Sequence, residues 1–435
     1  MHRLFLSLYM LLFATTSGAA DESWLVTTDR WGNPSHQILE LRTDSRTLSG
    51  TLDGDALQGS RRGDVLSFTV TDEHGARYVF TGKRSGERIT GEADFPDTNH
   101  ADRRARHTFT ARRIPTRPDG PPRTHVFTPA TYSNEFSATR APVLILWPGD
   151  SVRTTTLDSG GVDEHGVTRA LYGNPQTGPF YIAGAAPGDT IAVHLTRLRL
   201  NRDYADSLDG IVPRALSAAQ AIRSAALGKP VRWALDLARG TASPQDASGA
   251  LSAFTVPLRP MLGGLAVAPG DGWPPMSAGD TGRNGGNMDF NEVVEGNVVY
   301  LPVFQPGALL YLGDAHALQG DGETSQYGLE TSMEVEFRVE LVRGKAITMP
   351  RIESPRQIFV LGQAGSLDDA LRTATDGMLQ WLRQDYGLDA SEAAQVLGSS
   401  VQYRVANLAG RSVGLAAAID KARLENVRRG GGGSP

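Results

Sequence analysis

Short runs in which apolar and polar residues alternate fill the first part of the chain, from Trp24 to Arg113. Alternation with a period of two places successive side chains on opposite faces of a strand, so each run predicts a strand with one buried face. Gly, Asp and Asn residues that favour turns separate the runs, at a spacing typical of an antiparallel barrel or sandwich. We therefore expect residues 21–113 to form a small all-β domain.

The pattern breaks at residues 114–123, IPTRPDGPPR, which contain four prolines and one glycine. Such a segment suits a semi-rigid, extended linker, because proline restricts the backbone and cannot donate a hydrogen bond to a sheet. A second domain is therefore predicted over residues 124–427. The glycine-rich residues 428–435 are predicted to be a disordered tail.

The second domain also begins with strands. Its clearest one is SMEVEFRVELVRG, in which apolar residues from Met333 to Leu341 alternate without exception with charged ones. The period then changes to that of an amphipathic helix over residues 366–387, with Ser366 as its N-cap. A second helix is expected over residues 391–400, capped by Ser391. The predicted fold class is mainly β with an α/β C-terminal portion, preceded by a small antiparallel β-barrel or sandwich.

Composition narrows the class of protein. The chain has 435 residues, of which 40% are hydrophobic and 21% charged, as expected of a soluble globular protein with one or two cores. Its net charge of −5 offers no basic surplus, which argues against a nucleic-acid partner. Because the chain contains no cysteine, a thiol nucleophile is excluded and any metal site must use histidine and carboxylates.

Residues 1–20 have the pattern of a secretory signal peptide. A positive charge at Arg3 precedes an apolar run over residues 4–13, and small residues precede Asp21. The run is too short for a typical membrane span, although an uncleaved membrane anchor is an alternative. We expect a periplasmic or secreted protein with no membrane attachment after cleavage.

Candidate chemistry gathers in residues 313–323, GDAHALQGDGE, after a buried strand predicted over residues 308–312. Asp314 and His316 lie two apart and leave the same face of an extended chain, while glycines allow Asp321 and Glu323 to fold back toward them. Carboxylates this close repel one another unless a cation or a proton compensates, and histidine with carboxylates suits zinc or a similar ion. The alternative is a solvated surface loop.

Two further loops contain candidate groups. Residues 282–292, GRNGGNMDFNE, could present amide groups from Asn287 and its glycines to a carbonyl oxygen, and they include Asp289. The alternative is a simple hairpin in which Asn-Gly supplies the turn. Asp158 lies just beyond a predicted strand and is the third candidate. Residues 163–165 are expected to form a solvated turn.

Several of these motifs together resemble the acetamidase/formamidase family. The resemblance spans about residues 125–423 and rests above all on GGNMDF followed by YLPVFQPGALLYLGDAHALQGDGE, in the family's order and spacing. It implies a β-rich, sandwich-like domain with an α/β C-terminal portion, assembled as a homo-oligomer. It also implies hydrolysis of short aliphatic amides to a carboxylate and ammonia.

The resemblance implies a divalent ion, with zinc as first choice and calcium or manganese as alternatives. Its candidate ligands are Asp158, Asp289, His316 and Asp321, with Asp314 as either a ligand or a catalytic group. Water activated by the ion would be the nucleophile. Glu323 is the candidate general base and later proton donor to the amine. Asn287, with the backbone amides of residues 285 and 286, is the candidate oxyanion hole.

The chain departs from the family in its signal peptide, in its extra β domain and at Gln326 and Tyr327, where members commonly have small residues. Two alternative functions therefore stay open. One is a non-catalytic cell-envelope binding protein with a structural metal. The other is hydrolysis of another C–N bond, in a lactam, a urea-like compound or an amino-acid amide.

Overall fold

The structure, a computed structural model, describes residues 21–100, 102–270 and 273–427. The predicted signal peptide and C-terminal tail lie outside these residues. Contacts divide the chain into two compact units, one ending at Ile114 and the other beginning at Pro115. We call them the barrel unit and the second unit and describe each by itself.

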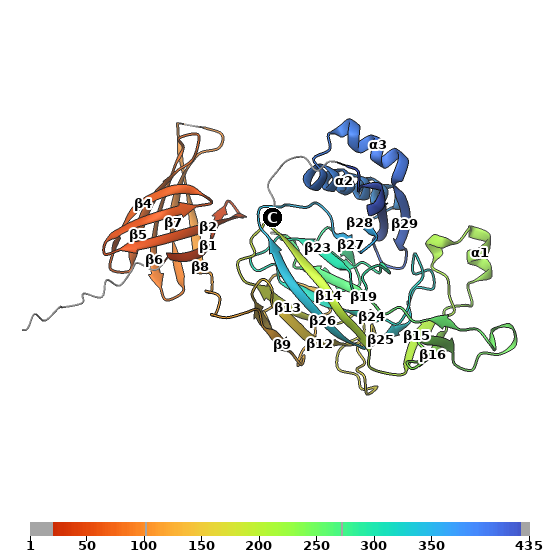
Figure 1. Cartoon of the computed structure of the whole chain (residues 1–435). Coiled ribbons are helices and arrows are strands. Elements are labelled where there is room, and N and C mark those ends of the chain that lie inside the picture. Colours follow the sequence, from red (N-terminus) through yellow and green to blue (C-terminus); the bar gives the residue numbers. More distant parts are fainter. Residues whose placement is uncertain (1–20, 101, 271–272, 428–435) are drawn as a thin grey trace, which may run out of the picture. The chain divides into compact units, whose positions relative to one another are not determined.

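The described residues of the barrel unit form a closed antiparallel barrel of eight strands, in which each strand pairs with the next and β1 also pairs with β8 (Figure 1). Alternate side chains, among them Trp24, Leu39 and Phe80, point inward and are fully buried. The prediction of a small antiparallel barrel or sandwich is confirmed, and of these two alternatives the structure has the barrel. The strands are β1 (Asp21–Arg30), β2 (Asn33–Asp44), β3 (Thr47–Leu52), β4 (Asp55–Arg62), β5 (Val65–Thr71), β6 (Arg77–Ser85), β7 (Arg88–Pro96) and β8 (Arg104–Arg113).

Two large sheets build the second unit. In order, the described strands of the first are β29 (Gln402–Asn407), β30 (Val413–Asp420), β28 (Gln357–Ala364), β27 (Arg351–Glu353), β23 (Val298–Pro302), β14 (Thr190–Leu200), β26 (Met333–Val342), β12 (Ser151–Thr156) and β9 (Thr124–Val126). Those of the second are β18 (Val256–Pro257), β17 (Thr241–Pro244), β16 (Pro230–Asp236), β15 (Tyr204–Leu208), β25 (Glu330–Thr331), β24 (Leu310–His316), β19 (Met261–Val267), β22 (Gly285–Asn287) and β21 (Thr281–Gly282), with β11 (Leu144–Leu146) and β13 (Gln176–Ile182) beside them. A short pair, β10 (Glu135–Phe136) and β20 (Met276–Ser277), completes the strands.

The main hydrophobic core lies between these two sheets. Val193 and Phe337 come from the first sheet, while Leu265 and Leu312 come from the second, and all four are buried in one cluster. The alternation predicted along β26 is observed, since its apolar residues face this core and Glu334 faces solvent. The mainly β architecture predicted from the sequence is therefore confirmed. β24 is an inner strand of the second sheet, between β19 and β25, which explains why its whole length is buried.

Two helices, α2 (Leu367–Tyr386) and α3 (Ala390–Ser400), form the α portion of the second unit, where α2 packs on β28 and β30 (Figure 1). Ser366 caps α2 as predicted, because its side chain accepts a hydrogen bond from the N–H of Asp369. The predicted cap of α3 is wrong: Asp389, not Ser391, caps it, since Asp389 and Glu392 form a reciprocal capping box.

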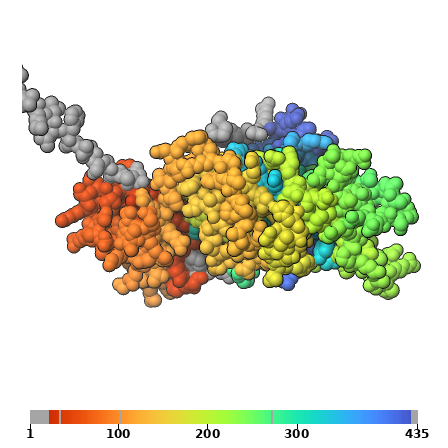
Figure 2. Space-filling model, turned by 90° about the horizontal axis from the view of Figure 1, so that it is seen from below, coloured from red at the N-terminus to blue at the C-terminus, as the bar shows by residue number. Residues whose placement is uncertain are grey.

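The part of the second unit that contains α1 (Ala218–Arg223) and β16 extends from one end of that unit (Figure 1, Figure 2). Short 3₁₀ helices cover Pro213–Ala215, Gly249–Leu251 and Lys421–Arg423. None of the helices found in the described residues has the length and apolar character that a membrane-spanning helix needs.

Candidate active site and metal centre

Five ionisable side chains meet in the interior of the second unit, and we call them the acid cluster: Asp289, Asp314, His316, Glu323 and Glu330. Each is at most 5% exposed. Their backbones come from β24, from β25, from the residues after β22 and from the loop between β24 and β25. The solvated-loop alternative for residues 313–323 is therefore excluded for these side chains. The strand expected over residues 308–312 is also corrected, since β24 runs to His316 and includes the acidic segment.

The backbone at three acidic positions of the cluster is left-handed. Asp289, Asp314 and Glu323 have φ angles of 42°, 54° and 45°. A non-glycine residue in this region costs of order 1 kcal/mol or more and persists only where the surrounding structure fixes it. Strain of this kind gathers at functional sites, so its presence at three neighbouring carboxylates marks the cluster as a functional candidate.

The geometry of the cluster fits a cation. Two triads, one of Asp289, His316 and Glu323 and the other of Asp314, His316 and Glu330, each offer ligand atoms within 4.8 Å of one another. His316 Nε2 lies 3.0 Å from Glu330 Oε1 and 3.6 Å from Asp314 Oδ1. Four buried atoms of the acid cluster have no hydrogen-bond partner among the described residues, namely Asp289 Oδ1, Asp314 Oδ1, His316 Nε2 and Glu330 Oε2. Because buried polar atoms normally have partners, this group of atoms points to a ligand bound among them.

Gln319 fixes the tautomer of His316. The Nδ1 atom of His316 lies 2.8 Å from Gln319 Oε1, and the Nε2 amide of Gln319 donates to the backbone carbonyl of Asp289. Since the amide nitrogen of Gln319 is a donor, the other atom of that amide, Oε1, accepts a hydrogen bond from His316 Nδ1–H. His316 Nε2 then carries the lone pair that a metal requires, in the arrangement common to metal-binding histidines.

Electrostatics in the cluster favour either protons or a cation. Burial raises the pKa of Asp289 well above its usual value, and repulsion from Asp314 raises it further. Burial likewise raises the pKa of Glu323, and repulsion from Asp289 adds to this effect. Burial also raises the pKa of Glu330, although His316 opposes this. Burial by itself would lower the pKa of His316, but Glu330 and Asp314 together raise it well above the usual value. A bound divalent ion would supply the same compensation as these protons.

Two glycines leave the space that the cluster occupies. A Cβ atom at Gly263 of β19 would lie 2.4 Å from Asp289 Oδ1 and 2.6 Å from Asp314 Oδ2. A Cβ atom at Gly328 would lie 2.5 Å from His316 Nδ1. Gly328 also donates its backbone N–H to Glu323 Oε1 and Glu330 Oε1, at 3.1 Å each, so it orients two carboxylates of the cluster.

The cluster lies within a stretch that matches known proteins. Residues 278–408 match the model of the Acetamidase/Formamidase family. All five members of the acid cluster fall within this family segment.

An acetamidase of Mycolicibacterium smegmatis is 36% identical over 86 residues, which are 20% of this chain. The chain spans 21% and 11% of the lengths of the first two curated relatives it matches. Among solved structures, an acetamidase of Yersinia enterocolitica is similar with a TM-score of 0.61 and 26% identity, covering 70% of this chain and 94% of that one. A predicted acetamidase/formamidase of Thermoanaerobacter tengcongensis shares the fold, with a TM-score of 0.60, 24% identity and coverage of 71% and 99%.

Two carboxylates expected as metal ligands lie outside the acid cluster. Asp158 is buried, but its Oδ2 accepts a hydrogen bond of 2.7 Å from Arg202 and its Oδ1 accepts one from the N–H of Val162. Asp321 binds Arg404 at 2.7 Å, and its side chain is 44% exposed. The assignment of both as ligands is corrected, because each carboxylate is already compensated by a guanidinium.

The expected oxyanion hole is also corrected. Asn287 donates its side-chain amide to Asp289 Oδ2, and its Oδ1 accepts a hydrogen bond of 2.8 Å from Asn174. The glycines at 285 and 286 lie in β22 between β19 and β21, where the sheet uses their backbone. This segment therefore forms the hairpin named as the alternative, and Asn287 holds a cluster carboxylate instead.

The loop after Asp158 also differs from its expected form. Asp163 is buried and accepts a hydrogen bond from the guanidinium of Arg169, whereas a solvated turn was expected over residues 163–165.

Several members of the site were missed by the sequence analysis. Glu330 joins the cluster from β25, Gln319 holds His316, and Asn407 donates to Asp289 Oδ2 at 2.6 Å. Gln319 and Glu330 stand in or just after the acidic motif, so their proximity in sequence was an available signal. Asn407 lies 118 residues from Asp289, and nothing in its local sequence indicates the contact.

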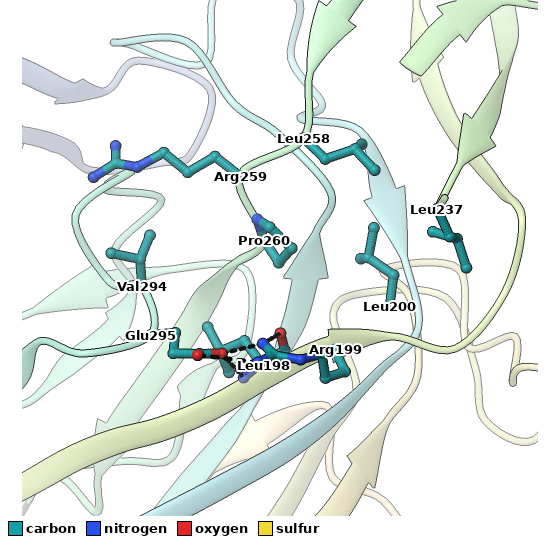
Figure 3. A pocket seen from close by; sticks show the side chains of 9 residues that line it. All are labelled: Leu198, Arg199, Leu200, Leu237, Leu258, Arg259, Pro260, Val294 and Glu295. Atoms are coloured by element: carbon teal, nitrogen blue, oxygen red, sulfur yellow. Dashed lines mark hydrogen bonds and ion pairs between the residues drawn. The ribbon is translucent and has the colours of Figure 1, made fainter. Parts of the chain in front are cut away.

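A cavity of about 450 Å³ lies elsewhere in the second unit (Figure 3). The ion pair between Arg199 and Glu295 forms part of its wall, beside apolar side chains such as Leu200 and Leu258. None of the residues that line it belongs to the acid cluster. We therefore locate the chemistry at the acid cluster and not in this cavity.

Proposed function

We propose that the protein is a metal-dependent hydrolase that cleaves the C–N bond of short linear amides, such as formamide or acetamide, to a carboxylate and ammonia. The observation that carries the proposal is a buried cluster of four carboxylates and one histidine, with four unpartnered ligand atoms, inside the acetamidase/formamidase family segment. Similarity to an acetamidase supports the substrate class.

Asp289, Asp314, His316 and Glu330 would hold the divalent ion, because each has a buried ligand atom without a partner among the described residues. Of the ligands expected from the sequence, this set keeps Asp289 and His316. Glu330 is new, and Asp314, expected as either a ligand or a catalytic group, is here a ligand. Mixed nitrogen and oxygen ligands favour zinc, with manganese or calcium as the other candidates. A bound ion would supply Lewis-acid polarisation of nearby oxygen atoms.

Glu323 is the proposed general base and acid. Burial and its neighbour Asp289 raise its pKa above the usual value, which moves it toward the pH at which a carboxyl group can both take and return a proton. In the proposed reaction Glu323 takes a proton from the attacking water, the water oxygen bonds to the amide carbon, and the C–N bond breaks. Glu323 then returns that proton to the leaving nitrogen, which gives the carboxylic acid and ammonia. At neutral pH the acid loses its proton to ammonia, so that amide and water together give carboxylate and ammonium.

The depth of the cluster supports a small substrate. Its members are almost fully buried, and Tyr327, next to Gly328, is tied by a hydroxyl hydrogen bond of 2.6 Å to Tyr172 on another loop. A long or branched amide would have to displace such groups. Lactams, urea-like compounds and amino-acid amides are the alternative substrates, and a panel of them beside formamide and acetamide separates these possibilities.

The test of the proposal measures ammonia release with formamide and acetamide. We expect Glu323→Gln to lower the rate by about 10²-fold or more, because it removes a proton-transfer group but keeps the size of the side chain. Glu334→Gln, on the exposed face of β26, is the matched control and should keep full activity. Chelation should abolish activity, and elemental analysis should find a divalent ion. Full activity in Glu323→Gln and after chelation would refute the proposal.

A location outside the cytoplasm and a homo-oligomeric assembly remain proposals. The first rests on the pattern of residues 1–20. Mass measurement of the protein purified from cells would reveal cleavage before Asp21, and an intact N-terminus would contradict it. Light scattering would give the oligomeric state.

A further inference from the structure

A buried guanidinium outside the acid cluster has no carboxylate partner among the residues that the structure describes. Arg351 of β27 is 2% exposed, and no carboxylate of the described residues lies within ion-pair distance of it. Its Nη2 donates to the amide oxygens of Gln380 and Gln384 on α2, at 3.0 and 2.8 Å, and its guanidinium stacks on Trp381. Its Nε atom has no hydrogen-bond partner in the described part of the chain. A buried charge of this kind is costly unless something compensates it.

Arg351 lines a small cavity of about 50 Å³ between β14, β23 and α2. Thr190, Tyr300 and Lys345 contribute polar groups to it, and Val342 and Ile347 contribute apolar ones. One water molecule takes up about 30 Å³ in the liquid, so the space suits a ligand of one or two atoms better than a large anion such as a phosphate ester.

The charges around the cavity leave one positive charge in excess. Asp385, which also lines it, is compensated by Lys345 Nζ at 2.5 Å and by the indole N–H of Trp381 at 2.8 Å. Glu353 accepts from the hydroxyl of Tyr300 and pairs with Lys421. Arg351 is the remaining charge. Consistent with this, burial lowers the pKa of Arg351 to about 10, although Asp385 opposes the effect.

We propose that this cavity is a binding site for a small monovalent anion of halide size, in the cell chloride, held by the Nε–H of Arg351. The anion would accept the hydrogen bond that Nε otherwise lacks and would neutralise the excess charge. Its expected role is structural, because it would fasten α2 to β27, an inner strand of the first sheet, through Arg351. The inference is independent of the proposed amide hydrolysis.

The experiment compares thermal unfolding of the full chain in sodium chloride and in sodium gluconate at matched ionic strength. Gluconate is too large for the cavity, so only chloride can bind there. We expect chloride to raise the unfolding midpoint by about 2 °C or more, since a ligand that binds only the folded state stabilises it. In crystals grown or soaked with bromide, we expect an anomalous peak beside Arg351 Nε.

Variants test whether Arg351 is responsible. Arg351→Met keeps an unbranched side chain but removes the charge, so the difference between chloride and gluconate should disappear. Arg153→Met, which removes an exposed guanidinium from β12, should retain it. If Arg351→Met does not fold, the anomalous signal in bromide crystals of the unmodified protein decides whether the anion binds beside Arg351. Equal midpoints in the two salts together with no bromide at Arg351, which means that the cavity holds only water, would overturn the proposal.

Discussion

Gly263 shows how a single residue determines whether the acid cluster can form. Because a Cβ atom there would lie 2.4 Å from Asp289 Oδ1, alanine at this position must displace at least one carboxylate. We expect Gly263→Ala to lower metal content and to reduce ammonia release by about 10-fold or more, in line with other changes that disturb ligand orientation.

Gly320→Ala is the matched control for this prediction. It lies in the same acidic motif, but a Cβ atom there meets nothing within 4 Å. Elemental analysis and the amide assay measure both variants, and circular dichroism checks that they fold. A Gly263→Ala protein with normal metal content and activity would show that the carboxylates are not held as described.

Asp150 permits a prediction of pH dependence at the residue scale. Burial by itself would raise its pKa, but hydrogen bonds from the N–H groups of Arg123 and Trp147 and from His125 together lower it below the ordinary 3.8. The folded state therefore prefers the charged form. The stabilisation is fully present above pH 3.8 and is lost as the pH falls through the lower, folded pKa.

Asp150→Asn should therefore lower the free energy of unfolding by about 1 kcal/mol near neutral pH and by progressively less below about pH 4. Denaturant unfolding of both proteins over a pH series measures the difference. A difference that stays constant down to pH 2 would mean that the charge of Asp150 contributes nothing.

At the scale of elements, Gly362 allows α2 to lie close against β28. A Cβ atom at Gly362 would lie 1.8 Å from the carbonyl oxygen of Ala370, a backbone atom that can move only if the helix moves. We expect Gly362→Ala to lower the free energy of unfolding by about 1–3 kcal/mol or more, the usual cost of overpacking.

Gly365→Ala serves as its control, since a Cβ atom there has open space and the residue lies just beyond the same strand. Denaturant unfolding followed by the fluorescence of Trp381, which α2 buries, reports on this contact. Equal stability of the two variants would show that the helix can shift without cost.

At the scale of the whole molecule, the barrel unit has its own closed sheet and its own core. A barrel without free edges and with a complete core does not need the rest of the chain to bury its apolar face. We expect residues 21–114, expressed alone, to fold and to unfold cooperatively.

We also expect residues 115–427 to retain amide hydrolysis, because the acid cluster and its supporting residues lie wholly within them. Circular dichroism of the first fragment and the ammonia assay on the second measure these outcomes. An unfolded barrel fragment or an inactive but folded second unit would show that the two units depend on each other.

The sequence by itself determined features that depend on neighbouring residues. The alternation of Met333 to Leu341 predicted β26, and the cap of Ser366 predicted the start of α2, because strand faces and helix ends are set within a few residues. The motif at residues 313–323 likewise led to Asp314, His316 and Glu323, which the structure brings together with Asp289.

Only the tertiary structure decided which charges meet. Asp158 and Asp321 have the same chemistry as the cluster carboxylates, but Arg202 and Arg404 reach them from distant parts of the chain and make a cation unnecessary. Glu330 and Asn407 join the site for the opposite reason, because pairing of β24 with β25 and folding of β29 bring them to it. The role of a carboxylate depends on which groups lie next to it in the folded chain. Tertiary packing decides this, and the local sequence does not.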